Sequence, residues 1–282
     1  MDTEIYILPV KEEPQPKIRP WPVHSVGFTM EIDFYNFLKS SNITVGVPKE
    51  ADWHYLPINW SFWLLNHDYG RNGREEMQKY IDSVVIDDSK TFTVSEAGGL
   101  PASFNIGRML VFSANQMTNG ETPIPLMTLP HKFPEDFPQK KWLASFVGSM
   151  NHPIRKEMKE VLKDRGNVLI IESKKGEELF VNTIISSYAT LCPRGTSYSS
   201  YRFYESMQLG VVPIMISDVD FRPFPEHIEW DAISYWVDSP AKLPALLSNL
   251  SRKNLLRKGI LAQVIWRTLT DHGWCRTLLE YL

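Results

Sequence analysis

The residues best suited to chemistry lie in one stretch, residues 189–218. The turn formed by residues 193–195 presents the cation of Arg194, and residues 196–200 supply hydroxyl groups and backbone donors. Arg202 and Glu205 follow at a spacing that places both on one face of a helix. A guanidinium group can hold a diphosphate, and a carboxylate can accept hydrogen bonds from both hydroxyls of a ribose. The stretch predicts a nucleotide site, although such an arginine–glutamate pair is also common on solvated helices.

A second, weaker signal precedes this stretch. An apolar run at residues 143–147 leads into Gly148, and Arg155 opens the helix predicted after that loop. In parallel α/β sheets, ligands bind beyond the carboxyl ends of strands, where helix N-termini offer free N–H groups to phosphate. The loop is therefore a candidate diphosphate-binding turn, and a surface arginine is the equally simple alternative.

The elements that would position these residues alternate along the chain. The predicted strands span residues 5–10, 43–47, 54–58, 83–86, 91–94, 142–147, 167–171, 188–192 and 211–216. The predicted helices span residues 34–38, 75–81, 154–163, 176–183, 200–209 and 255–282. Because parallel neighbours need a crossover connection, this alternation predicts βαβ units and parallel sheets. The fold class is α/β.

Prolines divide the chain into two parts. Five of them fall between residues 122 and 138: Pro123, Pro125, Pro130, Pro134 and Pro138. Such a density is typical of a connection between domains rather than of a helix or strand. The predicted domains are residues 1–138 and 139–258, followed by a helix at residues 259–282 that crosses back to the first domain.

The composition excludes several classes of protein. Of the 282 residues, 43% are hydrophobic and 22% charged, and the formal net charge of −3 gives no general attraction to nucleic acid. Cys192 and Cys275 have no metal-ligand spacing and indicate no disulfide framework, so a reducing compartment is expected. The sequence has no secretory signal and no apolar run near the roughly 18 residues of a membrane span. We expect a cytoplasmic protein without a membrane anchor, of open oligomeric state.

The stretch from residue 191 onward resembles the C-terminal motif of the exostosin-like (family 47) glycosyltransferases. In that motif a Leu-Cys-Pro-Arg-Gly turn precedes a helix carrying arginine and glutamate, and a Gly-x-Val-Pro-Ile run leads to Ser-Asp. The matching positions here are residues 191–195, Arg202, Glu205, Gly210, residues 212–214, Ser217 and Asp218. The resemblance is close over residues 141–250 and loose before them, through residues 51–57 and 91–99. In size, the chain resembles the short soluble members that large algal viruses encode.

The resemblance implies two Rossmann-like domains that face a cleft, the GT-B arrangement, and inversion at the anomeric carbon. The nucleotide-sugar donor would bind in the C-terminal domain. Arg155, Arg194 and Arg202 would contact its diphosphate, Glu205 its ribose, and Ser197 and Ser199 its phosphate or sugar. Asp218 would contact the donor or cap the turn after its strand.

Inversion by direct displacement requires a general base that faces the donor from the N-terminal domain. Glu96 is the first candidate because it directly follows a predicted strand. Asp68, after an aromatic run, is the second, and Asp52 together with His54 is the third. Asp52, His54 and Trp60 are the candidate acceptor-binding residues, with core packing the alternative for the tryptophan.

Asp218-Val-Asp220 matches the acidic triplet that holds a divalent metal in other glycosyltransferases, but the implied fold argues for an enzyme without metal or cofactor. The viral likeness suggests UDP-xylose as donor and a capsid glycan as acceptor, in the host cytoplasm. A non-catalytic glycan-binding module is the main alternative. A phosphorylase and a nucleotide-sugar epimerase are further ones; for the epimerase the sequence lacks a Gly-x-Gly-x-x-Gly fingerprint.

Overall fold

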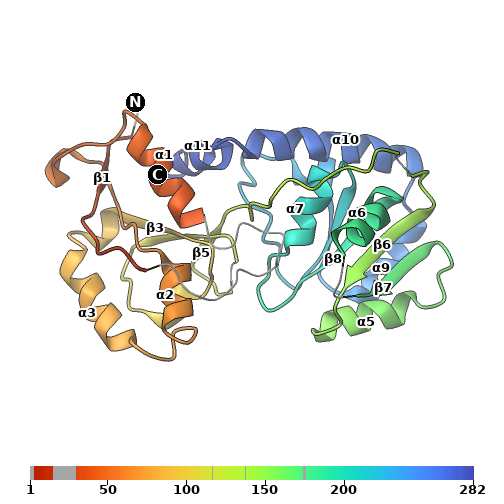
Figure 1. Ribbon diagram of the computed structural model, residues 1–282, viewed down its shortest axis with the longest axis horizontal. Helices are drawn as coiled ribbons and strands as arrows, with labels where there is room; N and C mark the ends of the chain where they lie inside the picture. Colours follow the sequence, from red (N-terminus) through yellow and green to blue (C-terminus); the bar gives the residue numbers. More distant parts are fainter. Residues whose placement is uncertain (1–2, 15–29, 116, 137, 174–175) are drawn as a thin grey trace. The chain divides into compact units, whose positions relative to one another are not determined.

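The computed structural model describes residues 3–14, 30–115, 117–136, 138–173 and 176–282. The chain forms two compact units (Figure 1). Unit 1 comprises Met1–Pro125 and His272–Leu282, and unit 2 comprises Leu126–Asp271. Each unit contains a five-stranded sheet in which every pairing is parallel, so the predicted α/β class with two Rossmann-like units is confirmed. The segments 126–138 and 259–271 belong to unit 2 by their contacts, and only the last residues return to unit 1.

The sheet of unit 1 has the strand order β1-β2-β3-β4-β5. Its strands are β1 (Ile5–Ile7), β2 (Trp53–Tyr55), β3 (Thr91–Ser95), β4 (Leu110–Ser113) and β5 (Glu121–Pro123). Its helices are α1 (Met30–Ser40), α2 (Trp60–Asn66), α3 (Arg74–Val84), α4 (Leu100–Ser103) and α11 (Gly273–Leu279). β3 is buried along its whole length, as expected of a strand covered on both faces.

The predicted strand at residues 43–47 is reduced to a single bridge on the outer side of β1. Ile5 N donates to Ile43 O at 2.9 Å, and Val45 N donates to Ile5 O at 3.0 Å, around one parallel bridge between Ile5 and Thr44. After β1, the chain thus passes first along one side of this strand, at Thr44, and then forms β2 on its other side. Ligands of open α/β sheets bind at such a reversal of strand order, so the binding position of unit 1 lies at the carboxyl ends of β1 and β2.

Aromatic side chains fill both faces of this sheet. On one face, Phe34 of α1 packs against Phe92 of β3 and Trp274 of α11, with ring centroids 5.9 and 5.7 Å apart. On the other face, the indole N–H of Trp60 donates to Thr93 Oγ1 at 2.8 Å, and α2 and α3 cover the strands. In Figure 1, α1 and α11 lie on the opposite side of the strands from α2 and α3.

The sheet of unit 2 has the order β10-β9-β8-β6-β7. Its strands are β6 (Trp142–Gly148), β7 (Val168–Glu172), β8 (Ser187–Pro193), β9 (Val212–Ile216) and β10 (Tyr235–Val237). Its helices are α5 (Pro153–Leu162), α6 (Glu177–Ile185), α7 (Tyr201–Gln208), α8 (Trp230–Ile233), α9 (Leu243–Ser248) and α10 (Arg252–Leu269). The order reverses between β6 and β8, which makes their carboxyl ends the binding position of this unit.

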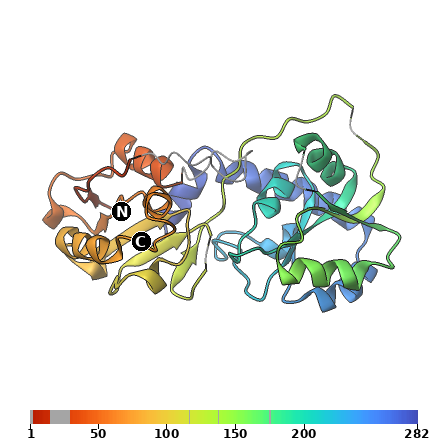
Figure 2. The same cartoon turned by 60° about the horizontal axis from the view of Figure 1, so that its bottom comes forward.

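Helices cover both faces of the second sheet as well. Met158 and Leu162 of α5 and Leu243 and Leu247 of α9 join the core on one face. Helices α6, α7 and α10 cover the other face (Figure 2). Gly210, predicted to stop α7, has a φ of 69°, a left-handed conformation that glycine adopts at little cost.

Two predicted elements are wrong. Residues 83–86 are not a strand, because Ser83 and Val84 complete α3 and its apolar positions pack into the core at helical spacing. The predicted helix at residues 255–282 is two helices, since Asp271 and His272 adopt positive φ between α10 and α11. The strands β4, β5 and β10 and the helices α2, α4, α8 and α9 were not predicted.

In the described part of the chain, none of the helices is both long and apolar enough to cross a bilayer. Cys192 and Cys275 are free and buried, one in each unit.

Candidate functional site

The strand-order reversal in unit 2 brings the two predicted basic segments together. β6 ends at Gly148 and β8 at Pro193, and these strands are direct neighbours. The loop to α5 follows β6, and the segment that carries Arg194 and leads to α7 follows β8. Three predicted site arginines, Arg155, Arg194 and Arg202, therefore lie at one edge of one sheet.

Arg202 is the centre of this cluster. Its Nη2 donates to the carbonyl of Val147 at the end of β6, and its guanidinium lies 4.4 Å from the centroid of the Phe146 ring. A Cβ atom on Gly148 would lie 2.6 Å from this Nη2, so only glycine leaves the guanidinium its place. The Nε–H of Arg202 is buried and has no hydrogen-bond partner among the described residues. Burial lowers the pKa of Arg202 from its usual value, with Cys192 and Glu205 acting in the opposite direction.

Arg155 donates hydrogen bonds to the segments that follow β6 and β8. Its Nη1 donates to Ser149 O and Asn151 Oδ1, both at 3.1 Å, and its Nε donates to Arg194 O at 3.3 Å. Burial, and then the nearby charge of Arg202, lower the pKa of Arg155 to about 10. Two guanidinium groups that disfavour each other's charge in a half-buried site create a position where an anion is stabilised.

Arg194 lies at the edge of the cluster and is paired with Asp218. Its Nε is 2.6 Å from Asp218 Oδ1, and its guanidinium lies 4.9 Å from the centroid of the Tyr198 ring. Asp220 pairs with a different residue, Arg222, at 2.7 Å. The two carboxylates of the acidic triplet thus have separate arginine partners. The described residues contain no group of three or more acidic, histidine or cysteine side chains that could hold a metal ion.

The hydroxyl-rich loop lies between Arg194 and α7. Ser199 is buried, and Ser197 Oγ donates to the carbonyl oxygen of Ser199 at 3.3 Å. The predicted phosphate or sugar contacts of both serines stay predictions. Both serines lie between Arg194 and the first turn of α7.

Glu205 is buried on α7 and is held by a histidine that the sequence did not single out. His131 Nε2 lies 3.2 Å from Glu205 Oε1, and His131 Nδ1 lies 3.0 Å from Glu177 Oε1. Burial favours the neutral ring, but hydrogen bonds and charges from Glu205 and Glu177 outweigh it and raise the pKa of His131 above its usual value. The backbone N–H of His131 also donates to Gln208 Oε1 at 2.8 Å, which fixes the histidine to α7.

In unit 1, Glu96 lies directly after β3 at the carboxyl edge of the sheet and is buried. Its backbone N–H donates to Oε1 of Glu31 at 3.1 Å, and the same oxygen accepts hydrogen bonds from Ser61. Glu31 is in the first turn of α1 and Ser61 in the first turn of α2. The first candidate for the general base thus belongs to a buried polar cluster near the strand-order reversal of unit 1.

The other candidates in unit 1 have structural partners. Asp68 lies in the turn after α2, where its 54% exposed side chain pairs with Arg71. Asp52 precedes β2, at the amino edge of the sheet, and accepts a hydrogen bond from Glu4 N. His54 is buried within β2 beside the carbonyl of Pro48, and Trp60 is a fully buried core residue.

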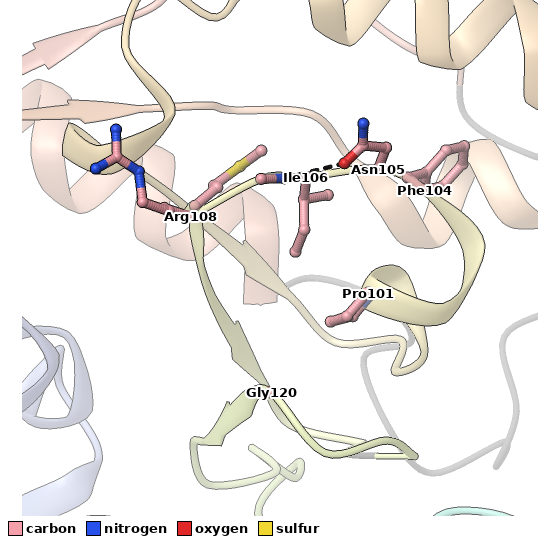
Figure 3. Close-up of a pocket in the computed structure, with 8 residues that line it drawn as sticks. Pro101, Phe104, Asn105, Ile106, Arg108 and Gly120 are labelled. Atoms are coloured by element: carbon pink, nitrogen blue, oxygen red, sulfur yellow. Dashed lines mark hydrogen bonds between the residues drawn. The ribbon is translucent and has the colours of Figure 1, made fainter.

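A cavity in unit 1 lies at the opposite edge of the sheet. It has a volume of about 420 Å³ and is lined by residues 104–109, Pro101 and Gly120 (Figure 3). Met109 and Gly120 precede β4 and β5, so the cavity lies at the amino ends of these strands. Ligands of parallel sheets bind at the carboxyl ends, and the predicted site residues do not line this cavity.

Sequence reasoning missed Glu31, Ser61, His131 and Glu177. His131 lies in the proline-rich segment that looked like a connection, and Glu31 lies before the helix predicted at residues 34–38. The available signal for Glu31 was its place: the first turn of a helix that follows a strand lies at the carboxyl edge of a parallel sheet.

Comparisons with known proteins identify the family of the chain. A family model described as "Exostosin GT47 domain" matches residues 2–250. A protein of Oryza sativa subsp. japonica named "Probable glucuronosyltransferase" is 22% identical over 82% of this chain and 64% of its own length. The "Probable beta-1,4-xylosyltransferase IRX10" of Arabidopsis thaliana is 22% identical over 82% of this chain and 67% of its own length.

The chain thus spans about two thirds of the length of these curated relatives. Among solved structures, AviGT4, a glycosyltransferase involved in avilamycin A biosynthesis, aligns over 99% of both chains with 11% identity and a TM-score of 0.39. The fold described above rests on the strand order of the two sheets and not on this similarity.

Proposed function

The chain belongs to the exostosin GT47 family of glycosyltransferases, and on this premise we propose that it transfers a sugar from a UDP-sugar to a glycan hydroxyl with inversion. The observation that carries the proposal is the arginine cluster of unit 2. Arg155 and Arg202 lie at the strand-order reversal, where the buried Nε–H of Arg202 lacks a partner among the described residues. A diphosphate oxygen would supply that partner.

The ribose would bind at Glu205. His131 contacts Oε1 of this carboxylate, so the group is held in one orientation, and we propose that the carboxylate accepts hydrogen bonds from the ribose hydroxyls. A carboxylate that accepts charge-assisted hydrogen bonds is a strong ribose ligand. Ser197 and Ser199 would complete the phosphate contacts, and Asp218 would orient Arg194.

The reaction requires a base for the acceptor hydroxyl. We assign this role to Glu96, which lies at the carboxyl edge of the first sheet. The acceptor oxygen forms a bond to the anomeric carbon, the bond from that carbon to the diphosphate oxygen breaks, and UDP leaves with the electron pair. The acceptor proton passes to the Glu96 carboxylate.

The arginines would neutralise the charge that develops on the leaving diphosphate, a role that a metal ion performs in other transferases. The ion pairs of Asp218 with Arg194 and of Asp220 with Arg222 support a reaction that needs no metal. For the donor sugar we propose xylose or glucuronic acid, since relatives carry the names of both transferases. A viral capsid glycan as acceptor and a cytoplasmic location are further parts of the proposal.

Transfer itself tests the function. Purified protein is incubated with UDP-xylose or UDP-glucuronic acid, with short xylan or deoxyhexose-containing oligosaccharides, and with excess chelator. We expect UDP release that depends on acceptor, with product of inverted configuration. Glu96→Gln should lower kcat by about a hundredfold or more while UDP binding is retained. Glycan binding without UDP binding would instead identify a non-catalytic glycan-binding module.

A further inference from the structure

Glu31 is a buried carboxylate of unit 1 that joins three segments of the chain. Its side chain is in the first turn of α1 and 3% of the residue is exposed. One oxygen, Oε1, accepts three hydrogen bonds: from Ser61 N at 3.1 Å, from Ser61 Oγ at 2.7 Å and from Glu96 N at 3.1 Å. These bonds join α1 to the start of α2 and to the segment after β3. The backbone of Glu96 is therefore held in place by Glu31.

The second oxygen of Glu31 is different. Oε2 is buried and has no hydrogen-bond partner among the described residues. An ionised carboxylate in such a place leaves a charged oxygen without compensation, which costs free energy, whereas a protonated Oε2 carries no charge. The geometry favours a neutral Glu31 with the proton on Oε2 and with Oε1 as the acceptor of the three bonds.

The titratable groups around Glu31 act in the same direction. Burial, and then the charge of Glu96, raise the pKa of Glu31 to about 7, against smaller opposing effects of the Ser61 and backbone hydrogen bonds. Glu31 also acts on Tyr55 of β2. Burial, and then the charge of Glu31, raise the pKa of the Tyr55 phenol above its usual value, so the phenol stays neutral. The other groups acting on Tyr55 are Cys275 and Tyr35. Two carboxylates this close in a buried site do not both ionise readily.

We propose that Glu31 is the positioning residue of the general base: it anchors the segment that carries Glu96 and holds the proton of the carboxylate pair, which leaves Glu96 ionised to receive the acceptor proton. This inference rests on the proposed function, in which Glu96 is the base. It adds a residue from α1, and it assigns the two carboxylates opposite protonation states at neutral pH.

The pH dependence of transfer follows from this assignment. Below the pKa of Glu31 the pair carries one charge, on Glu96. As the pH rises through about 7, Glu31 also ionises, and the like charges disfavour the arrangement in which Glu96 is anchored. We expect kcat to fall on the alkaline side with a midpoint near the pKa of Glu31.

Three variants distinguish a positioning role of Glu31 from a purely structural one. Glu31→Gln is neutral at every pH and keeps an acceptor oxygen for Ser61 and Glu96, so it should retain kcat at pH 6.5 within about threefold and lose the alkaline decline. Glu31→Ala loses the anchor and should lower kcat about tenfold or more at every pH. Asp33→Asn removes a charge from the same turn of α1 and should leave the profile unchanged.

An unaltered pH profile in Glu31→Gln overturns the proposal. So does a loss of kcat at every pH as deep as that of Glu96→Gln, because Glu31 would then be the base itself. ¹³C NMR titration of the glutamate side-chain carboxyls gives a readout without activity: one should titrate near pH 7, disappear in Glu31→Gln and shift to lower pH in Glu96→Gln. Ordinary titration of all glutamates overturns the inference even if transfer occurs, whereas absence of UDP binding and transfer refutes the proposed function.

Discussion

Gly148 and Arg202 depend on each other more directly than any other residues of the donor site. Gly148 is the last residue of β6, and the guanidinium of Arg202 occupies the space that a Cβ atom at position 148 would need. The backbone carbonyl before the glycine also accepts a hydrogen bond from the arginine. At the residue scale, the proposed diphosphate site depends on the absence of a side chain at Gly148 as much as on the charge of Arg202.

Replacing Gly148 with alanine should weaken UDP binding by about tenfold or more. The added Cβ would lie 2.6 Å from Arg202 Nη2, so the guanidinium must move and lose a charge-assisted hydrogen bond, which contributes about 1.5–3 kcal/mol. Isothermal titration calorimetry measures the change. Gly166→Ala is the matched control, because a Cβ there meets no atom within 4 Å. Equal affinity of Gly148→Ala and the native chain would contradict the proposed place of Arg202.

The residues also show what sequence patterns can and cannot predict. The family resemblance implied that Arg155, Arg194 and Arg202 share one diphosphate site, and the structure brings all three to one sheet edge. Glu31, Ser61 and His131 were not predicted, because their roles depend on contacts between segments 30 to 74 residues apart. Asp52 and His54 were candidates in residues 51–57, where the family resemblance is loose; Asp52 precedes β2 and His54 lies within it.

At the scale of elements, the long helix α10 makes a close backbone contact with the turn between α7 and β9. Gly259 of α10 packs on the turn between α7 and β9, where a Cβ would lie 2.3 Å from the carbonyl oxygen of Gly210. Alanine improves helix propensity by about 1 kcal/mol at such a position, but overpacking against backbone costs about 1–3 kcal/mol. The backbone atoms cannot move aside as a flexible side chain would, so the packing effect should dominate.

Gly259→Ala should therefore destabilise unit 2 by about 1–2 kcal/mol, despite the better helix propensity. Urea denaturation followed by fluorescence measures the free energy of unfolding. A gain in stability would show that α10 can shift away from α7 at little cost. Gly166→Ala serves again as the control that changes a glycine without a close neighbour.

Elements with strong periodic patterns were predicted well, and short ones were not. The helices α5, α6 and α7 and the strands β6, β8 and β9 lie within a few residues of their predicted positions. The strand predicted at residues 43–47 is one bridge, and the strand predicted at residues 83–86 begins with the last two residues of α3. A short apolar run fits the end of a helix as well as a buried strand, and only packing against other segments decides between them.

At the scale of the whole molecule, the chain crosses between its two units twice. Residues after Asp271 return to unit 1, where Trp274, Cys275 and Leu278 are buried. Phe34 of α1 packs on Trp274, and the indole N–H of Trp53 donates to Leu282 O at 2.8 Å. The end of the described chain is thus part of the first core, as the predicted crossing helix implied.

Removal of residues 272–282 should destabilise unit 1 and spare unit 2. Loss of a buried tryptophan and leucine costs about 1.5–3 kcal/mol for each in apolar burial alone. Hydrogen exchange measured by mass spectrometry should show faster exchange in α1 and β1 to β4, with unchanged protection in β6, β8 and β9. UDP should still bind. Loss of protection in both units would contradict the assignment of the terminal helix to unit 1.

Binding of UDP tests the central claim most directly, because every further step of the proposed reaction depends on it. By calorimetry, the native chain should bind UDP in the presence of chelator. Arg155→Ala and Arg202→Ala should each weaken UDP binding by about tenfold or more. Arg257→Ala, which replaces an exposed residue of α10, should leave the affinity for UDP unchanged. Circular dichroism and thermal melting identify any variant that fails to fold. Undiminished UDP binding by folded Arg155→Ala and Arg202→Ala proteins would contradict the assignment of the donor site.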